Sequence, residues 1–177
     1  MTYFLSGILT ILLHLCHVNQ NDNLIDWSTS RRLTWSDFQA EPPKTPAAAA
    51  LTSTTIKVDF GYFNETLTYH IHCRFDKSSS WGRVKNDYVL SHEQGHFDIA
   101  EIFARKLNEA LRKYRPESQN IPKDVNKIYQ DMMKKYYERQ DEYDKETNFS
   151  MDKKKQEEWL KIIDDELTAS DKLSNYH

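Results

Sequence analysis

The stretch LSHEQGHFDIAE, at Leu90–Glu101, carries the pattern H-E-x-x-H at His92, Glu93 and His96. Apolar residues recur at helical spacing through it and beyond it, which predicts a long helix over about residues 87–114. On a helix, side chains four positions apart differ in direction by only about 40°, so both imidazoles can face one ion. This helix is therefore expected to carry the functional site.

The residue types of the pattern point to zinc chemistry, because neutral imidazole nitrogens are among the ligands that Zn²⁺ prefers. His92 and His96 are the expected metal ligands. Glu93 follows the first ligand and points off the metal, so it is the expected general base that takes a proton from water. A surface helix with two solvated histidines is the alternative interpretation, since the pattern is short.

Two acids behind the pattern are poor candidates for the third ligand. Measured from His92, Asp98 projects at about 240° and Glu101 at about 180°, whereas His96 projects at about 40°. Both acids should therefore point away from the ion. We expect them to support the ligands from behind or to lie at the surface.

Gly95 lies inside the predicted helix, where glycine costs about 1 kcal/mol relative to alanine. A local reason for the glycine is therefore expected. The two interpretations are the close approach of a neighbouring strand and the close approach of a substrate backbone.

The third ligand is expected to come from another element. A second predicted helix, over about residues 122–143, has an apolar stripe that should mark its inward face. Asp144 lies at the edge of that stripe, about 70° from its centre, where the helix should give way to a loop. Asp144 is our first choice and Glu146 our second. His70 and His72 share one face of a predicted strand and stay open as alternatives, in case that strand borders the helix.

The order of predicted elements favours an α+β fold. Residues 51–75 are rich in β-branched and aromatic residues and predict two strands joined around Gly61–Asn64. The two helices described above follow, and then a third over about residues 152–168. A small antiparallel sheet followed by a long helix and two further helices is typical of this class. Residues 24–170 are expected to form a single domain.

Composition limits the classes of function. A net charge of −3 argues against a general nucleic-acid binder. Residues 1–20 have no charged side chain, and the apolar run Tyr3–Cys16 has the length of a signal peptide. Cleavage of that signal would leave Cys73 as the one cysteine, without an intrachain disulfide. We expect an exported protein, periplasmic or extracellular; an uncleaved N-terminal anchor is the alternative, and membrane contact is expected only through it.

Several segments resemble a bacterial family of unknown function that is often labelled predicted secreted zinc-dependent proteases. The resemblance covers about Leu33 to Leu167. It is carried by LTWSDFQ (Leu33–Gln39), the region of Trp81, LSHEQGHFDIAEIFARKL (Leu90–Leu107) and YDKETNFSMDKKKQEEWLKII (Tyr143–Ile163). It implies a zincin-like metallopeptidase domain with His92 and His96 as Zn²⁺ ligands and Glu93 as base. Arg105 also matches and is expected to pair with a nearby acid.

The match and the mismatch within the last segment bear on the third ligand. Tyr143 and Asp144 match the family, and Tyr143 is the expected oxyanion donor. Phe149 stands where many relatives have a histidine. If that histidine is the third ligand of the family, either Asp144 replaces it in this chain or the site binds zinc weakly. We expect a zinc metallopeptidase that hydrolyses peptides or proteins. The alternative is a non-catalytic envelope binding or scaffold protein with a vestigial or structural metal site, which Phe149 favours.

Overall fold

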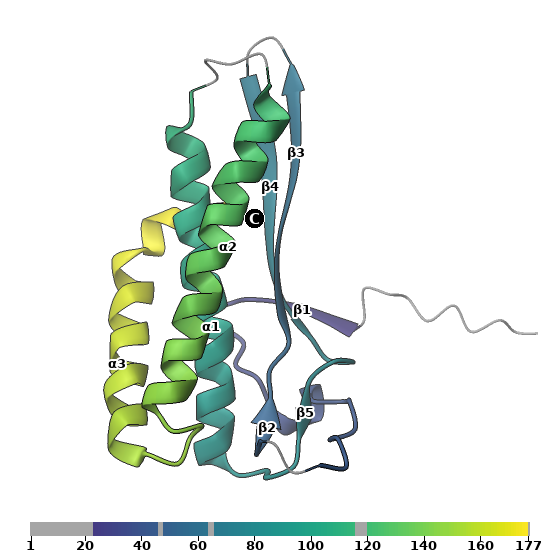
Figure 1. Cartoon of the computed structure of the whole chain (residues 1–177), viewed down its shortest axis with the longest axis vertical. Coiled ribbons are helices and arrows are strands. Elements are labelled where there is room, and N and C mark those ends of the chain that lie inside the picture. The colour runs from purple at the N-terminus through teal and green to yellow at the C-terminus, as the bar shows by residue number, and fades with distance from the viewer. Residues whose placement is uncertain (1–22, 46–47, 64–65, 116–119, 177) are drawn as a thin grey trace, which may run out of the picture.

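The computed structural model describes residues 23–45, 48–63, 66–115 and 120–176 (Figure 1). It has the predicted α+β fold, in which a small antiparallel sheet is followed by three α-helices. None of the described helices is both long and apolar enough to cross a membrane. The predicted signal peptide or anchor at residues 1–20 lies outside the described residues.

The sheet is built around one long hairpin. Strands β3 (Thr54–Phe63) and β4 (Thr66–Asp76) pair along their whole length, and β1 (Leu24–Asp26) adds to the other edge of β4. A separate pair is formed by β2 (Ala50–Leu51) and β5 (Trp81–Gly82). The predicted strands within residues 51–75 are therefore confirmed. The two residues after β2, Thr52 and Ser53, lead directly into β3, and Thr52 reaches the site described below.

Three helices complete the fold: α1 (Asp87–Lys113), α2 (Ile121–Glu146) and α3 (Lys153–Ala169). Asn86 caps α1 by accepting a hydrogen bond from the backbone N–H of Val89 at 2.9 Å. The second helix runs to Glu146, so Asp144 lies in its last turn and not in a loop.

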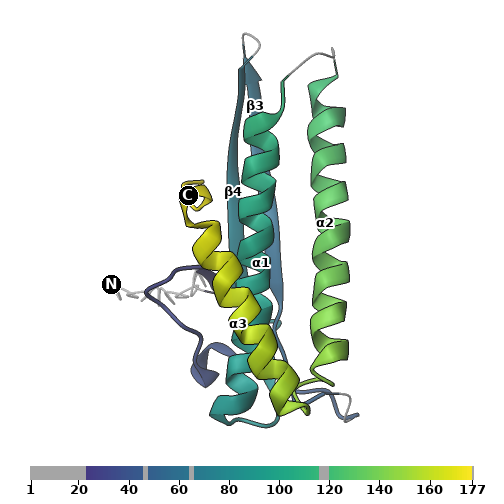
Figure 2. The same cartoon turned by 90° about the vertical axis from the view of Figure 1, so that its left-hand side faces the viewer.

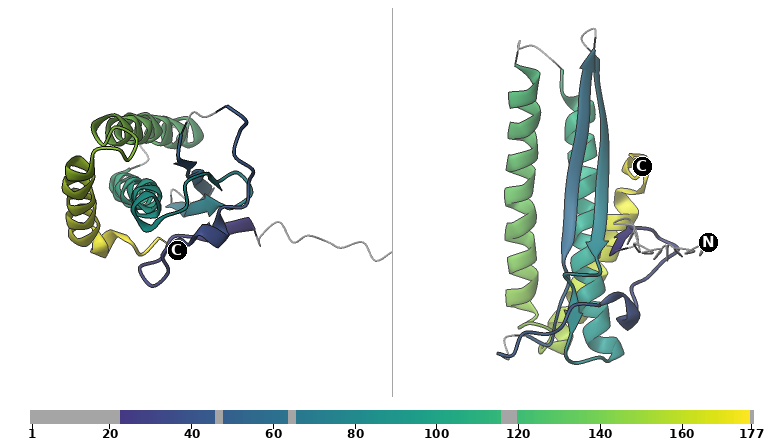
Figure 3. Two further views of the ribbon diagram at one scale, coloured as in Figure 1. Left: turned by 90° about the horizontal axis from the view of Figure 1, so that it is seen from below. Right: turned by 90° about the vertical axis from the view of Figure 1, so that its right-hand side faces the viewer.

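Helix α1 is the centre of the molecule. It lies between the β3–β4 hairpin on one side and α2 and α3 on the other, as the view from below shows (Figure 3). Figure 2 shows α3 crossing α1 while α2 runs alongside it. Most side chains of α1 between His92 and Leu111 are therefore buried, including Phe97, Ile99 and Leu107.

The two acids that were expected to point away from the ion do so, but neither lies at the surface. Asp98 is buried and accepts hydrogen bonds from Trp27 Nε1 and Gln94 Nε2, both at 2.8 Å. Glu101 is fully buried and accepts a hydrogen bond from the Tyr176 hydroxyl. These contacts attach residues near both ends of the described chain to the back of α1.

Arg105 pairs with Glu101, as predicted. Its Nε lies 2.7 Å from Glu101 Oε1, and its Nη1 donates to the carbonyl of Leu167 at 2.7 Å. Both side chains of the ion pair are almost completely removed from solvent. A buried carboxylate of this kind depends on its cationic partner, because no water can solvate the carboxylate if the cation is removed.

We predict that Arg105→Leu lowers the free energy of unfolding by about 3–5 kcal/mol, because Glu101 is left buried without a cation. Urea denaturation measures the change. Lys113→Leu is the matched control, since Lys113 pairs with Glu109 at the same spacing on the same helix but in solvent. The control should leave the midpoint unchanged, and equal effects of both variants would contradict the prediction.

Candidate metal centre

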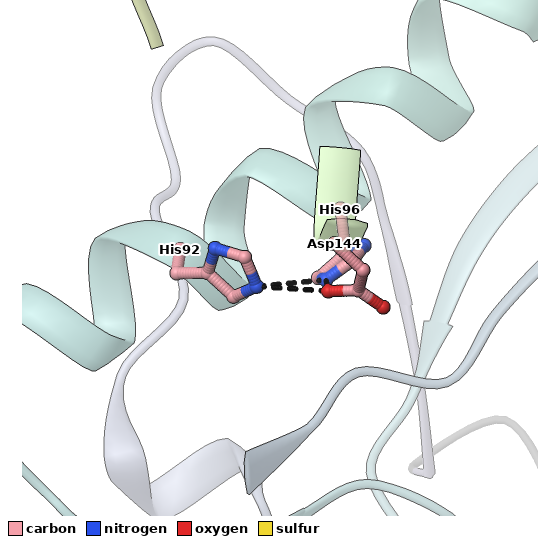
Figure 4. A group of neighbouring side chains, drawn as sticks. All are labelled: His92, His96 and Asp144. Carbon is pink, nitrogen blue, oxygen red and sulfur yellow. Dashed lines mark hydrogen bonds and ion pairs between the residues drawn. The ribbon is translucent and has the colours of Figure 1, made fainter. Parts of the chain in front are cut away.

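Three of the predicted site residues meet at one point. His92 and His96 come from α1 and Asp144 from the last turn of α2, and Figure 4 shows them pointing toward one another. Asp144 Oδ1 lies 3.1 Å from Nε2 of each histidine, and the two Nε2 atoms are 3.2 Å apart. Among the described residues, these three form the group that could hold a metal ion.

The spacing of these three atoms fits a small four-coordinate metal. Ligands about 2.0–2.1 Å from a zinc ion at tetrahedral angles lie about 3.3–3.4 Å from one another. The observed separations of 3.1–3.2 Å are within a few tenths of an ångström of this value. The donor set of two imidazoles and one carboxylate is also one that zinc accepts.

Gln140 sets the protonation of His96. Its Nε2 donates to the backbone carbonyl of His96 at 2.9 Å, which turns its Oε1 toward His96 Nδ1 at 2.6 Å. Nδ1 must therefore carry a proton, and in a neutral ring Nε2 then has a free lone pair. That lone pair faces the Asp144 carboxylate, an arrangement that requires a proton or a cation between them.

The electrostatics of the group agree with this requirement. Burial opposes ionisation of Asp144, but its hydrogen bonds with His92 and His96 outweigh burial and lower its pKa. Burial alone would lower the pKa of His96, yet the hydrogen bond to Asp144 and the charge of Glu93 raise it. The group therefore has excess negative charge in its neutral-histidine form and attracts a cation.

His92 is held mainly by an aromatic contact. Its ring stacks on Tyr143 with centroids 4.5 Å apart and an angle of 19° between the planes. Nδ1 of His92 is buried and has no hydrogen-bond partner among the described residues. Nε2, the nitrogen that faces the group, is thus the one with polar neighbours.

Tyr143 explains the glycine in the middle of α1. A Cβ atom at position 95 would lie 2.5 Å from the Tyr143 hydroxyl, so only glycine leaves room for the ring. Neither a strand nor a substrate backbone occupies this place, contrary to both expectations. Tyr143 is completely buried, and its hydroxyl donates to the carbonyl of His92 at 3.3 Å.

The expected role of Tyr143 as an oxyanion donor stays a prediction that this placement disfavours. The hydroxyl is directed at the backbone of α1, and Tyr143 does not line the cleft in front of the metal group. Burial raises the pKa of Tyr143, so its hydroxyl stays protonated. The structure favours a positioning role for this side chain.

Glu93 lies in the same cleft as the three ligand atoms. It is buried, and its Oε2 accepts a hydrogen bond from the Thr52 hydroxyl at 2.7 Å. Thr52 belongs to the segment between β2 and β3, so the sheet side of the molecule orients this carboxylate. The cleft has a volume of about 510 Å³ and lies between residues 48–54 and the C-terminal part of α2.

The alternative ligands do not join the group. His70 and His72 lie on the face of β4 opposite the buried Ile71, and the centroids of their rings are 4.8 Å apart. Glu146 accepts a hydrogen bond from Trp159 Nε1 at 2.9 Å, which turns it toward α3. Of the first and second choices, the structure therefore favours Asp144.

Sequence patterns did not reveal Thr52 or Gln140. Each contacts a site residue more than 40 positions away, at separations of 41 residues for Thr52–Glu93 and 44 for Gln140–His96. Gln140 lies one turn before Asp144 on α2, so a helical projection from Asp144 could have suggested it. No comparable local signal distinguishes Thr52 from its neighbours.

We predict that Gly95→Ala destabilises the protein, although alanine is the better helix former by about 1 kcal/mol. The added methyl group overlaps the buried Tyr143 ring, and overpacking of this kind costs about 1–3 kcal/mol. Thermal unfolding measures the change. Tyr143→Phe in the Gly95→Ala background removes the closest atom and should restore part of the loss. A more stable Gly95→Ala variant would show that the contact is not tight.

Comparison with known proteins gives one match. Residues 17–151 match the model of DUF922, described as "Bacterial protein of unknown function". No curated protein matches the chain, and no solved structure matches it either. The matched residues make up more than half of the chain and include the metal-binding group and the residues that line its cleft. The chain therefore belongs to the DUF922 family of bacterial proteins of unknown function.

Proposed function

We propose that this protein is a zinc-dependent metallopeptidase that hydrolyses peptide bonds in exported or envelope proteins. The observation that carries the proposal is the convergence of His92, His96 and Asp144 beside the carboxylate of Glu93, in one open cleft. Two ligands and a base from one helical turn, completed by an acid from a second helix, suit metal-assisted hydrolysis.

The group of His92, His96 and Asp144 would hold the zinc ion. When bound there, zinc supplies Lewis acidity, which polarises a carbonyl group and makes water more acidic. Gln140 keeps the proton of His96 on Nδ1, away from the ion. Tyr143 fixes the plane of the His92 ring by stacking on it. These outer contacts orient the ligands before any ion arrives.

Glu93 is the proposed general base. Its carboxylate takes a proton from the attacking water and later returns it to the leaving amine. The hydroxyl of Thr52 donates to one carboxylate oxygen, Oε2, so the proposed proton transfer is assigned to the other oxygen, Oε1. Thr52 therefore acts as a positioning residue that limits rotation of the base.

Localisation is part of the proposal and rests on the sequence. The uncharged residues 1–20 favour export, with either cleavage or retention of the segment as an anchor. The substrate would then be a peptide or protein outside the cytoplasm. The zincin-like classification likewise rests on the H-E-x-x-H helix and the family resemblance.

The position of Tyr143 favours a second candidate function. Because the expected oxyanion donor is buried behind the ligands, the group could also serve as a structural metal site in a non-catalytic binding or scaffold protein. In that case zinc would stabilise the contact between α1 and α2 without hydrolysis. The two candidates differ in whether Glu93 matters for anything beyond folding.

We predict that the purified chain binds about one zinc ion and that Asp144→Ala weakens binding by more than about 100-fold. Gln140→Leu should weaken it by about 10–100-fold, as loss of an outer hydrogen-bond partner does. Competition with a chelator of known affinity gives the values. Glu146→Ala is the control, because that acid bonds to Trp159 and should not affect zinc. Wild-type affinity in Asp144→Ala would remove Asp144 from the site.

We predict that Glu93→Gln retains zinc and its unfolding temperature but loses peptide cleavage by about 10²–10⁴-fold, the usual contribution of a general base. The assay is hydrolysis of an unfolded protein such as reduced casein by the zinc-loaded chain. Equal cleavage by Glu93→Gln and wild type would refute this mechanism. Stoichiometric zinc with no cleavage by wild type would favour the structural-site candidate.

A further inference from the structure

Exposed apolar side chains gather around the metal-binding cleft. Nine large hydrophobic residues are exposed in the described part of the chain, and three of them line this cleft. They are Leu51 with 44% of its surface exposed, Tyr137 with 60% and Phe149 with 56%. Leu51 lies on the sheet side of the cleft, and the two aromatic residues lie on or just after α2. Together they form an apolar rim, Leu51–Tyr137–Phe149, around the ligand group.

The rest of the cleft has no charge. Apart from the three ligand residues and Glu93, none of the described residues that line it is Asp, Glu, Lys or Arg. This is unusual for a chain in which 29% of residues are charged. A second groove, beside α1, α2 and α3, shows the contrast, since nine of its ten lining residues are charged. A charged side chain of a substrate would therefore find no partner in the cleft other than the metal-binding group and Glu93.

The backbone at Phe149 has a defined conformation that is closed by a hydrogen bond to the end of α2. Asn148, Phe149 and Ser150 all have positive φ values, of 49°, 52° and 66°, which non-glycine residues rarely adopt. The backbone N–H of Phe149 donates to the carbonyl of Asp144 at 2.8 Å. This bond is of the type that closes a helix C-terminus. It attaches the rim phenylalanine directly to the residue that supplies the third ligand.

We infer that the cleft selects an uncharged peptide segment with a bulky apolar side chain next to the scissile bond. This inference rests on the proposed function and adds the class of substrate. The apolar side chain packs against Phe149 and Tyr137, and Leu51 covers its other side. Burial of that side chain provides the binding energy. A charged side chain placed against the rim would lose its hydration without gaining a partner there. The cleft volume of about 510 Å³ is in the range of pockets that bind a short segment.

Binding of short peptides tests the inference without turnover. The protein is zinc-loaded Glu93→Gln, and the probes are fluorescent, end-blocked hexapeptides that differ only in their two central residues: Phe-Leu, Lys-Lys or Glu-Glu. Fluorescence anisotropy gives the dissociation constants. We expect the Phe-Leu peptide to bind at least about tenfold more tightly than either charged peptide.

Variants of the rim assign the preference to its residues. Phe149→Ala and Tyr137→Ala should each weaken binding of the Phe-Leu peptide by about tenfold and leave the charged peptides unaffected. Phe149→Leu keeps an apolar contact and should retain most of the affinity. Met151→Ala is the matched control, because Met151 is 70% exposed two residues later but does not line the cleft. Zinc content and unfolding temperature of each variant are measured in parallel.

Two results would overturn the inference: charged peptides that bind as tightly as Phe-Leu, or a preference that survives in the Phe149→Ala/Tyr137→Ala double variant. Failure of the proposed function has a different signature. It would appear as absent cleavage by the wild type, or as cleavage that does not depend on Glu93. Because binding is measured on the Glu93→Gln variant, either result can occur without the other.

Discussion

The close approach of α2 to α1 at Gly95 is the contact on which the metal centre depends. A side chain at position 95 would collide with Tyr143, so the glycine lets the two helices come together there. Gln140, Tyr143 and Asp144 lie at positions i, i+3 and i+4 of α2 and therefore share one face. That face meets the turn of α1 that contains His92 and His96, and each of its three residues contacts one of them or both. One helix contact thus positions the third ligand, the ring of the first ligand and the proton of the second.

Helix α1 makes contacts in several directions, which explains why most of its residues between His92 and Leu111 are buried. Its histidines face α2, Glu93 faces Thr52 on the sheet side, and Asp98 and Glu101 bind residues near the two ends of the described chain. Asp98 and Glu101 lie on the side of α1 opposite the metal-binding group, and their burial is costly. Hydrogen bonds compensate Asp98, and the cation of Arg105 compensates Glu101. These contacts anchor α1 on the side opposite the histidines, which supports the positions of the ligands and the base.

The chemistry of the cleft follows from the same arrangement. Among the described residues that line it, the carboxylates are Asp144 and Glu93, and both lie near the two ligand histidines. The apolar rim of Leu51, Tyr137 and Phe149 lines the same cleft and offers binding energy for an apolar side chain.

Much of the fold and part of the site could be predicted from local patterns. Helical periodicity is a property of neighbouring residues, so the sequence alone determined the helix of His92 and His96, the direction of Asp98 away from the ion, and Asp144 as the acid nearest the apolar stripe of α2. The sequence also determined the α+β class, because β-rich and helical segments follow one another along the chain. Family membership agrees with the resemblance carried by the central segment.

Contacts between distant segments could not be predicted in this way, because they depend on how the helices and the sheet dock. Only the tertiary structure decided that Tyr143 fills the space beside Gly95. It also decided that Gln140 orients His96 and that Thr52 orients Glu93. The same holds for the two strand histidines, which lie on the face of β4 away from the core. The uncharged character of the cleft is likewise invisible in a chain rich in charge. It arises because residues 48–54 and the end of α2 bring uncharged residues to one place, on either side of the ligands that α1 supplies. The sequence determined which residues could act, and docking of α2 on α1 decided which of them meet.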